Sequence, residues 1–346
     1  MSKGFTTAGA PSLSVIIVNY KSARLIADCL ESLEAQTPDL QYEVIVVDNA
    51  SDDGSEALLT ARFPGIRYHQ MGYNSGFSRA NNAGIRMARA AAVLLLNPDT
   101  IILDKAVQRC FADFSGDSGY VACGVQLLEE DGRPQISGSF NMKGGINTLL
   151  PLPYWGSFLR WLGYKLQSRI PNVPEATAKT DVDWINGAYL MVSMAAIDQA
   201  GMMDEDFFLF SEEIEWCSRL RKHGKLCIYG QHRVIHLQGE TTKHSFNSAD
   251  KGYYNLYDKK GLQIMVSSFL RVRKQFGLAW FLFMLLNYLI AVPVSFVCAL
   301  PLLFYHPAAW VSRMKLFGGF YLNMLIFLYR YSWRIVMKKK YFYKVI

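Results

Sequence analysis

The chain has 346 residues, of which 51% are hydrophobic and 19% are charged, and this composition excludes a disordered or collagen-like protein. The formal net charge of +7 is unevenly distributed. Residues 250–346 hold 14 basic and 2 acidic residues, which leaves 36 − 14 = 22 basic and 29 − 2 = 27 acidic residues in the first 249. A mildly acidic body joined to a basic, apolar tail favours a membrane over nucleic acid as partner.

The cysteines and the amino terminus indicate a compartment. None of the six cysteines forms a CxxC pair, and no spacing among them is typical of a zinc site or a disulfide framework. A reduced, cytosolic setting follows. The first twelve residues contain no apolar segment, so we expect no signal peptide.

The first hundred residues alternate apolar, β-branched runs with segments of helical periodicity. The pattern predicts strands at residues 13–18, 42–47, 66–69 and 92–96, and helices at residues 21–36 and 74–86. Strands that alternate with helices are typical of a parallel sheet covered by helices on both faces. The sequence therefore predicts an α/β fold.

Polar residues follow three of these predicted strands. They are Asn19 and Tyr20, then Asp48 and Asn49, and then residues 97–99. Ligands of parallel sheets bind at the carboxyl ends of the strands, so these residues predict one common site. The turn after the first strand contains no glycine, which excludes a dinucleotide-binding turn and a P-loop.

Two aspartates of this predicted edge have chemical roles available. Asp48 is able to accept a hydrogen bond from the imide N–H of uracil or thymine, or it caps the next helix. Asp99 offers carboxylate oxygens to a divalent cation that bridges a diphosphate, or it belongs to an Asn-Pro-Asp turn. Asn74, Gly76 and Asn81 either contact the nucleotide or only shape a loop and a helix start.

A second acidic segment lies further along the chain. After the aromatic residues Phe207, Phe208 and Phe210, the acidic residues Glu212, Glu213 and Glu215 occupy the first turn of a predicted helix, with Ser211 as its N-cap. Acidic residues there suit the helix dipole, and one of them is equally suited to act as a general base. Adjacent helical residues point about 100° apart, so we expect one of the pair Glu212 and Glu213 to face the cleft.

His236 ends a short predicted strand. The histidine is either structural, a metal ligand or a phosphate contact.

The tail that follows is apolar. Residues 277–305 carry no charge, and residues 316–329 are also apolar, with basic residues before the first run and after the second. This pattern predicts a membrane hairpin. Because Pro293 and Pro301 break the first run, an interfacial helix pair and a buried core remain as alternatives.

Taken in order, six segments resemble a known family: SVIIVNY (14–20), VVDNASDDGS (46–55), NSGFSRANNAGI (74–85), LLLNPDT (94–100), WINGAYLMV (184–192) and DEDFFLFSEEIEWCSRLR (204–221). They resemble the bacterial family 2 glycosyltransferases, in the rhamnosyltransferase-like branch. The resemblance implies a GT-A fold with a mainly parallel central sheet, a dTDP- or UDP-activated sugar donor, inversion at the anomeric carbon, and Mg²⁺ or Mn²⁺ as cofactor.

The resemblance also implies individual roles. Asp48 matches the base-reading aspartate, and Asn97 and Asp99 occupy the place of the DxD metal motif, with Asn in its first position. The pair Glu212–Glu213 matches the family's Glu-Asp pair, so Glu213 is the expected base and Glu212 the supporting acid, while His236 lies where some relatives have a metal ligand. The donor nucleotide is expected at Asn19, Tyr20, Asp48, Asn49, Asn74, Gly76 and Asn81, and the sugar or acceptor at Trp184, Asn186, Gly187 and Phe208.

These expectations define an organisation and an activity. We expect a flexible start at residues 1–11, a catalytic domain at 12–249 with an acceptor-side insertion at about 140–180, a basic helical connector at 250–275, and a membrane-associated hairpin with a basic tail at 276–346. The expected reaction moves a sugar, with L-rhamnose as best guess, onto a polyprenyl-diphosphate-linked glycan at the cytoplasmic face of a bacterial inner membrane. The alternatives are a UDP-sugar donor (galactofuranose, glucose or an amino sugar), a nucleotidyltransferase, and a catalytically degenerate scaffold.

Overall fold

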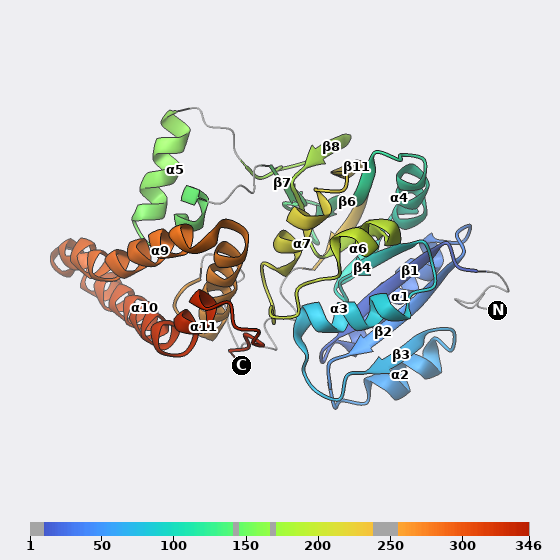
Figure 1. Cartoon of the computed structure of the whole chain (residues 1–346), viewed down its shortest axis with the longest axis horizontal. Helices are drawn as coiled ribbons and strands as arrows, with labels where there is room; N and C mark the ends of the chain where they lie inside the picture. The colour runs from blue at the N-terminus through green and yellow to red at the C-terminus, as the bar shows by residue number, and fades with distance from the viewer. Residues whose placement is uncertain (1–9, 141–144, 167–170, 238–254, 346) are drawn as a thin grey trace. The chain divides into compact units, whose positions relative to one another are not determined.

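A computed structural model describes residues 10–140, 145–166, 171–237 and 255–345, and the chain divides into two compact units. The first unit comprises residues 1–142, 170–205 and 213–244, and the second comprises residues 143–169, 206–212 and 245–346. Figure 1 shows both units, coloured along the chain.

The first unit is built on a nine-stranded mixed sheet in the order β3-β2-β1-β4-β10-β6-β11-β5, with β8 paired to β11. Its strands are β1 (Leu13–Asn19), β2 (Tyr42–Asp48), β3 (Arg67–Gln70), β4 (Ala92–Leu96), β5 (Thr100–Ile102), β6 (Tyr120–Leu128), β8 (Lys179–Val182), β10 (Tyr189–Ser193) and β11 (Lys225–His236). The first four strands run parallel, as the alternating sequence predicted. A two-stranded sheet of β7 (Gly138–Ser139) and β9 (Trp184–Ile185) lies apart from it.

Helices cover both faces of the large sheet, because the strands are apolar on both sides (Figure 1). One face packs against α1 (Ala23–Gln36), α2 (Ser55–Arg62) and α4 (Ala106–Ser115), and the other against α3 (Gly76–Met87), α6 (Met194–Ala200) and α7 (Glu212–Leu220). Residues alternate between the two cores, so that Val15 and Ile17 face one layer and Ile16 faces the other. At Gly84 a Cβ would lie 2.4 Å from Ile16 Cγ2, so glycine is what allows α3 to approach β1 closely.

β11 differs from the short strand expected before His236. It has 12 residues and pairs with β5, β6 and β8, and a bulge lies between Tyr229 and Arg233. The strand is long because it crosses a sheet in which both faces are buried, and His236 still forms its last residue. The mixed sheet and its flanking helices thus confirm the predicted α/β class.

The second unit is helical and has its own apolar core. It contains the 3₁₀ turn η1 (Gly145–Leu149), α5 (Trp155–Lys165), α9 (Lys259–Tyr305), α10 (Pro307–Ile326), the π-helical turn η2 (Phe327–Ser332) and α11 (Trp333–Val336). Phe269 lies near the centre of this core, with ring centroids 4.4 Å from Phe327, 5.1 Å from Tyr288 and 5.4 Å from Phe281.

The long helix α9 changes direction at a glycine and continues through both of its prolines. Gly277 has φ 88° and ψ −171°, which folds the segment before it back against the segment after it. Pro293 and Pro301 were expected to break the apolar run, but both lie inside the helix. The structure therefore has a helical hairpin of α9 and α10, preceded by a buried helical segment at 259–276.

Candidate active site

The carboxyl ends of β1, β2 and β4 form one edge of the sheet. The parallel register places Asn19, the last residue of β1, opposite Asp48, the last residue of β2, and β4 lies on the other side of β1. Neighbouring strands are about 4.8 Å apart, so the ends of β2 and β4 are separated by about 10 Å. The fold thus brings the predicted donor residues at 19–20, 48–49 and 97–99 to a common edge.

Asp48 is held rigidly at this edge. Its Oδ1 accepts hydrogen bonds from Asn19 Nδ2 (2.5 Å) and Ser51 Oγ (2.5 Å), and its Oδ2 accepts one from the Ser51 backbone N–H (3.0 Å). The side chain does not cap α2, because that helix begins at Ser55, whose N–H is bound by Asp53. The helix-cap alternative is therefore wrong, and Asp48 instead closes the loop after β2.

The remaining predicted donor residues make contacts within their own loops. Asn49 links β2 to α3, because its Nδ2 donates to Gly76 O (3.0 Å) and its Oδ1 accepts from Ser75 Oγ (2.5 Å). Asn74 Oδ1 accepts from the Gly76 N–H (3.2 Å), and Asn81 donates to a carbonyl of its own helix. Gly76 has φ 72°, which glycine adopts without strain. These contacts support the loop-shaping alternative for Asn74, Gly76 and Asn81. Tyr20 is half-buried beside Lys21.

A carboxylate and an imidazole face each other where β4 ends. β11 pairs with β5 so that His236 lies opposite Thr100, next to Asp99. The distance from His236 Nε2 to Asp99 Oδ1 is 3.5 Å, and Asn97 Nδ2 lies 3.5 Å from the same nitrogen. His236 Nδ1 is 2.9 Å from Gln135 Oε1, and Gln135 Nε2 donates to His236 O (2.6 Å). Both His236 and Asp99 are buried.

These contacts fix the chemical character of the pair. Because the Gln135 oxygen can only accept, the proton of a neutral His236 belongs on Nδ1, which leaves Nε2 without a proton, 3.5 Å from both Asp99 Oδ1 and Asn97 Nδ2. Asp99 Oδ1 is buried and has no hydrogen-bond partner among the described residues. Two electron-pair donors that face each other without a proton between them fit a divalent cation, and Gln135 is the outer partner that orients a metal-bound histidine.

The pair does not form a complete protein cage. No group of three or more His, Cys, Asp or Glu side chains in the described ranges is arranged to hold a metal. A Mg²⁺ or Mn²⁺ ion held by one or two protein ligands usually completes its coordination with water and substrate phosphates. The donor set of Asp99 and His236 therefore fits a cation that arrives with, or is completed by, a diphosphate.

The acidic helix α7 separates the roles of its glutamates. Glu215 forms a bidentate ion pair with Arg219, with contacts of 2.8–3.1 Å, so its carboxylate is committed to the helix. Glu212 is buried and Glu213 is half-buried. A Cβ on Gly187 would lie 3.7 Å from Cβ and Cγ of Glu213 and 3.8 Å from Phe77 Cε1, so Gly187 and Glu213 are neighbours.

Gly187 connects Glu213 to the edge of the sheet. The carbonyl of the next residue, Ala188, accepts a hydrogen bond from the Asn97 N–H (3.0 Å). The backbone thus leads from Asn97 through Ala188 and Gly187 to Glu213 in short steps. The fold brings the acidic helix to the edge that carries Asp99.

Some loops of this edge have a strained backbone. Nine described residues other than glycine have positive φ, and three of them, Lys21, Ala50 and Asp52, lie in the loops after β1 and β2. Phe210 (φ 71°) and Ser211 (φ 67°) directly precede α7, so Ser211 lacks the extended backbone of an N-cap. Each such residue costs on the order of 1–3 kcal/mol, and strain of this kind is typically maintained at functional sites.

The predicted sugar and acceptor residues have different surroundings. Trp184 is half-buried in β9, and its Nε1 has no hydrogen-bond partner among the described residues. Asn186 closes a turn, because its Oδ1 accepts from the Ala188 N–H (3.0 Å). Phe208 belongs to the second unit, where it is 3% exposed and packs 5.5 Å from the ring of Phe342. Sugar contacts at these positions stay predictions.

Gln135, Ser51 and Phe77 are parts of this edge that the sequence did not indicate. Gln135 is 101 positions from His236, and no local pattern connects the two residues. Ser51 had a weak signal, since a serine three residues after an aspartate commonly closes an Asx-type turn. Phe77 lay within a quoted segment but carried no polar chemistry to mark it.

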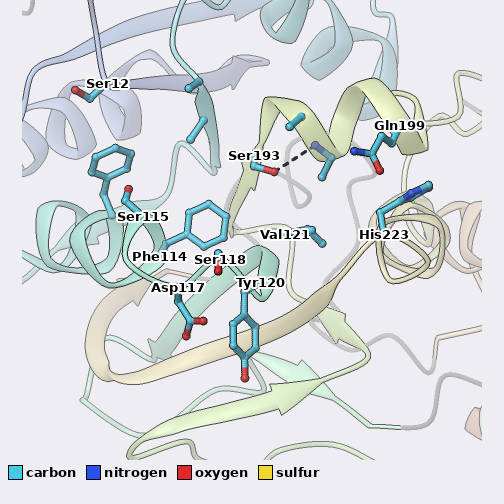
Figure 2. Close-up of a pocket in the computed structure, with 15 residues that line it drawn as sticks. Ser12, Phe114, Ser115, Asp117, Ser118, Tyr120, Val121, Ser193, Gln199 and His223 are labelled. Carbon is cyan, nitrogen blue, oxygen red and sulfur yellow. Dashed lines mark hydrogen bonds between the residues drawn. The ribbon is translucent and has the colours of Figure 1, made fainter.

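A pocket of about 380 Å³ lies at the opposite ends of the strands. Figure 2 shows Ser12, which precedes β1, together with Ser193, which ends the antiparallel β10, and with Phe114, Tyr120 and His223. Parallel sheets bind their ligands at the carboxyl ends of the strands. This pocket, at the amino end, is therefore not the predicted donor site.

Comparisons with known proteins agree with this architecture. Residues 14–171 match the model of glycosyl transferase family 2. The chain is 31% identical over 216 residues to the low-salt glycan biosynthesis hexosyltransferase of Haloferax volcanii, which covers 61% of this chain and 62% of the relative. It is 26% identical over 245 residues to the N-acetylglucosaminyl-diphospho-decaprenol L-rhamnosyltransferase of Mycobacterium tuberculosis, which covers 66% of this chain and 77% of the relative.

A solved structure supports the fold. The mannosyltransferase of Pyrobaculum calidifontis, in complex with GDP-Man and Mn²⁺, superposes with a TM-score of 0.52 at 14% identity, and covers 93% of this chain and 88% of its own. Residues 14–171 are thus similar to the glycosyl transferase family 2 domain, the fold is of the GT-A type, and the relatives support a glycosyltransferase.

Proposed function

We propose that this protein is an inverting, metal-dependent glycosyltransferase that moves a sugar from a nucleotide diphosphate onto a lipid-linked glycan acceptor. The observation that carries the proposal is the pair Asp99 and His236, oriented by Gln135, at the sheet edge that α7 also reaches through Gly187. The family 2 match and the relatives named hexosyltransferase and rhamnosyltransferase support the same reaction class.

Asp48 is proposed to read the nucleobase. Its Oδ2 accepts a hydrogen bond from the Ser51 N–H, and the Tyr68 hydroxyl also interacts with the carboxylate, whose oxygens can each accept more than one hydrogen bond. The imide N–H of uracil or thymine is a donor that matches this acceptor. The short bonds from Asn19 and Ser51 keep the carboxylate in place, so little ordering is needed when the base binds.

Asp99 and His236 are proposed to hold Mg²⁺ or Mn²⁺, with Asn97 beside them. When bound, the cation supplies positive charge that stabilises the departing nucleoside diphosphate. The protein's part is to offer an oxygen and a nitrogen donor at a buried position, and to keep the imidazole in the tautomer with Nε2 deprotonated.

Glu213 is proposed to accept the proton of the acceptor hydroxyl. As the hydroxyl oxygen forms its bond to the anomeric carbon, the bond from that carbon to the diphosphate oxygen breaks and the proton moves to Glu213. A single displacement from the face opposite the leaving group inverts the configuration and requires one base. Glu215 is unsuited to this role because Arg219 already binds both of its oxygens, and Glu212 is proposed as the supporting acid.

The donor and acceptor are proposed from the relatives' names. The mycobacterial relative is named for a diphospho-decaprenol substrate and for L-rhamnose, which favours a dTDP-rhamnose donor and a polyprenyl-diphosphate-linked glycan acceptor. The Haloferax relative is named only as a hexosyltransferase of low-salt glycan biosynthesis, so a bacterial source and a bacterial inner membrane stay predictions.

A membrane location is proposed from the second unit. Within the described residues one helix, α9, is long and apolar enough to cross a membrane by length and composition. From Lys259 to the end of the sequence there is no acidic residue, which favours the anionic cytoplasmic face of a bilayer. We propose that the first unit lies on that cytoplasmic side.

Release of nucleoside diphosphate from a panel of nucleotide sugars, with membrane extract as acceptor, tests the proposal. We expect one dTDP- or UDP-sugar to be turned over and Glu213→Gln to lower the rate at least about 10³-fold. The matched variant Glu215→Gln, an acid-to-amide change on the same helix, retains the rate within about threefold. Full activity of Glu213→Gln would show that the base assignment is wrong.

A further inference from the structure

The hairpin of α9 and α10 exposes an apolar surface. In the part of α9 that follows Gly277, the buried residues fall on one face, at Phe281, Met284, Tyr288, Ala291 and Ser295. The exposed large side chains of the same segment are all apolar: Leu278, Trp280, Leu282, Phe283, Leu286, Leu289, Ile290, Val294, Val297, Leu300, Leu303, Phe304 and Tyr305. Contiguous apolar surface of this extent marks a membrane or protein contact.

A second exposed surface in the same unit has interfacial character. α5 and the residues flanking it expose Trp155 (41%), Phe158 (44%), Trp161 (54%) and Tyr164 (83%). The rings of Trp155, Phe158 and Trp161 stack in sequence, with centroids 5.3 and 5.9 Å apart. The helix carries Arg160 and Lys165 and no acidic residue. Tryptophan and tyrosine with basic residues are typical of the headgroup region of a bilayer.

One aromatic cluster fixes the level of α5 along the hairpin. The ring of Tyr154, the residue before α5, lies 6.1 Å from Phe317 of α10, and Phe317 lies 5.9 Å from Phe296 of α9. Beyond this level α9 has nine more residues to Tyr305, and α10 has ten from Pro307. At 1.5 Å per residue the tip extends at most about 15 Å past the start of α5.

A bilayer core is about 30 Å thick, so this reach is about half of it. We propose that the second unit is a monotopic membrane module: α5 lies in the headgroup region of an anionic bilayer, and the α9–α10 hairpin enters the same leaflet without crossing to the far side. This inference rests on the proposed membrane location. Exposed apolar residues also lie on α9 between Gly277 and Phe296. If the hairpin is tilted toward the membrane plane, these residues enter the same leaflet.

Charges argue against the crossing arrangement. If the tip reached the far surface, the start of α5 would lie near the middle of the bilayer, together with Arg160 and Lys165, where each charge is costly. In the monotopic arrangement both residues reach the headgroups. Arg313 and Lys315 lie only four and two residues from Phe317, about 6 and 3 Å along the helix, so their long side chains extend back to the lipid phosphates.

Cysteine accessibility tests the depth. Cys298 is exposed and the other five cysteines are buried, so Cys298→Ser provides a background for a reporter at the tip, Ala308→Cys. The full chain is added to preformed liposomes that contain phosphatidylglycerol, and a membrane-impermeant maleimide is supplied either outside or trapped inside. Asp131→Cys in the same background, at an exposed position of the first unit, reports the outer side.

We expect Ala308→Cys to remain unlabelled from both sides and to react fully after detergent is added, whereas Asp131→Cys reacts from outside. Labelling of Ala308→Cys from inside would show that the hairpin crosses, and labelling from outside would show that it is not inserted; either result overturns the proposal. Flotation of the liposomes distinguishes failure of the proposed membrane location from failure of the proposed depth. A protein that does not float with the liposomes contradicts membrane association itself. A protein that floats and is labelled from inside contradicts only the proposed depth of the hairpin.

The role of α5 has its own readout. The double variant Trp155→Ala/Trp161→Ala removes two exposed side chains and leaves the core intact. We expect its partitioning onto phosphatidylglycerol liposomes to fall at least about tenfold. Tyr73→Ala, which removes an exposed aromatic of the first unit, serves as the matched control and should bind as the unaltered protein does. Equal binding of all three proteins would overturn the interfacial placement of α5.

Discussion

The two ends of the central sheet each contain a buried carboxylate, but the two carboxylates differ in the hydrogen bonds that they accept. At the amino end, Glu43 of β2 accepts hydrogen bonds from Ser14 Oγ (2.7 Å), the Arg89 N–H (2.7 Å) and Arg67 Nη1 (2.9 Å). At the carboxyl end, Asp99 Oδ1 is equally buried and lies 3.5 Å from His236 Nε2, without a hydrogen bond from any described residue.

The contrast agrees with the proposal that the carboxyl end of the sheet binds a ligand, whereas the amino end stabilises the fold. A buried charge that is fully hydrogen-bonded stabilises the native state, whereas one that lacks a donor is costly. Glu43 therefore connects β2 to β1, to β3 and to the segment that precedes β4. The free-energy cost of burying the Asp99 carboxylate is offset when a cation binds there. Each of the following substitutions tests this division.

The largest expected effect is that of Asp99→Asn. The amide removes the negative charge that would hold the cation, so transfer activity should fall about 10³-fold. Stability should not fall, because an amide nitrogen is able to donate to His236 Nε2, and Tm should stay equal or rise by a few degrees. Activity assays and thermal unfolding with and without Mn²⁺ measure both effects.

A metal-dependent rise in Tm that survives in Asp99→Asn would contradict the metal assignment. A large fall in Tm without Mn²⁺ would mean that Asp99 is structural, as Glu43 is. Either result would remove the contrast between the two ends of the sheet.

Glu43→Gln is expected to act on stability instead. Burial by itself would raise the pKa of Glu43, but the hydrogen bonds from Ser14, Arg67 and Arg89 hold that pKa below its ordinary value of 4.5. A depressed folded-state pKa gives stability above the unfolded pKa and loses it as pH falls through the folded one. The variant should therefore be less stable by about 2–3 kcal/mol at pH 7, and by much less near pH 3.

Urea unfolding at both pH values measures the difference. Under conditions in which Glu43→Gln remains folded, it should keep its transfer activity, because Glu43 lies at the end of the sheet away from the proposed site. A stability loss that does not depend on pH would show that packing, and not the charge, is what Glu43 contributes.

Gln135→Leu tests the orientation of His236. Without the Gln135 oxygen, the proton of the imidazole is no longer held on Nδ1, and Nε2 loses its fixed direction. Loss of an outer partner of this kind typically lowers metal affinity 10- to 100-fold. We expect a matching rise in the Mn²⁺ concentration for half-maximal activity, with the rate at saturating Mn²⁺ largely restored. Gln199→Leu, at an exposed glutamine that lines the pocket at the opposite end of the sheet, should leave the Mn²⁺ requirement unchanged.

Gly187→Ala is expected to have the smallest effect. The added methyl would contact Glu213 and Phe77 at ordinary van der Waals distance, so the fold should accept it with little change in Tm. It occupies space beside the proposed base, and we expect KM for the acceptor to rise a few-fold. Gly187→Val, with a larger side chain at the same place, should raise it further. If neither variant changes KM for the acceptor, the acceptor does not bind beside Gly187.

The sequence by itself determined the class of the fold and the edge of the sheet at which the proposed site lies. Apolar runs such as 13–18 and 42–47 are buried on both faces, so their residues alone predicted parallel strands and helices on either side. Because such strands end at a common edge, Asp48 and the Asn97–Asp99 turn were predictable as neighbours. The acidic start of α7 was also readable, since the signal is local.

Only the tertiary structure decided which of these groups are committed to the fold and which are available. Gln135 is brought to His236 by sheet pairing, Gly187 to Glu213 by helix packing, and Tyr154 to Phe317 by the second unit's core. Contacts between residues far apart in the chain leave no periodic pattern, so they could not be inferred. For the same reason the sequence left open both the role of Asp48 as a helix cap and the depth of the hairpin, because each depends on distances between elements and not on the residues within one.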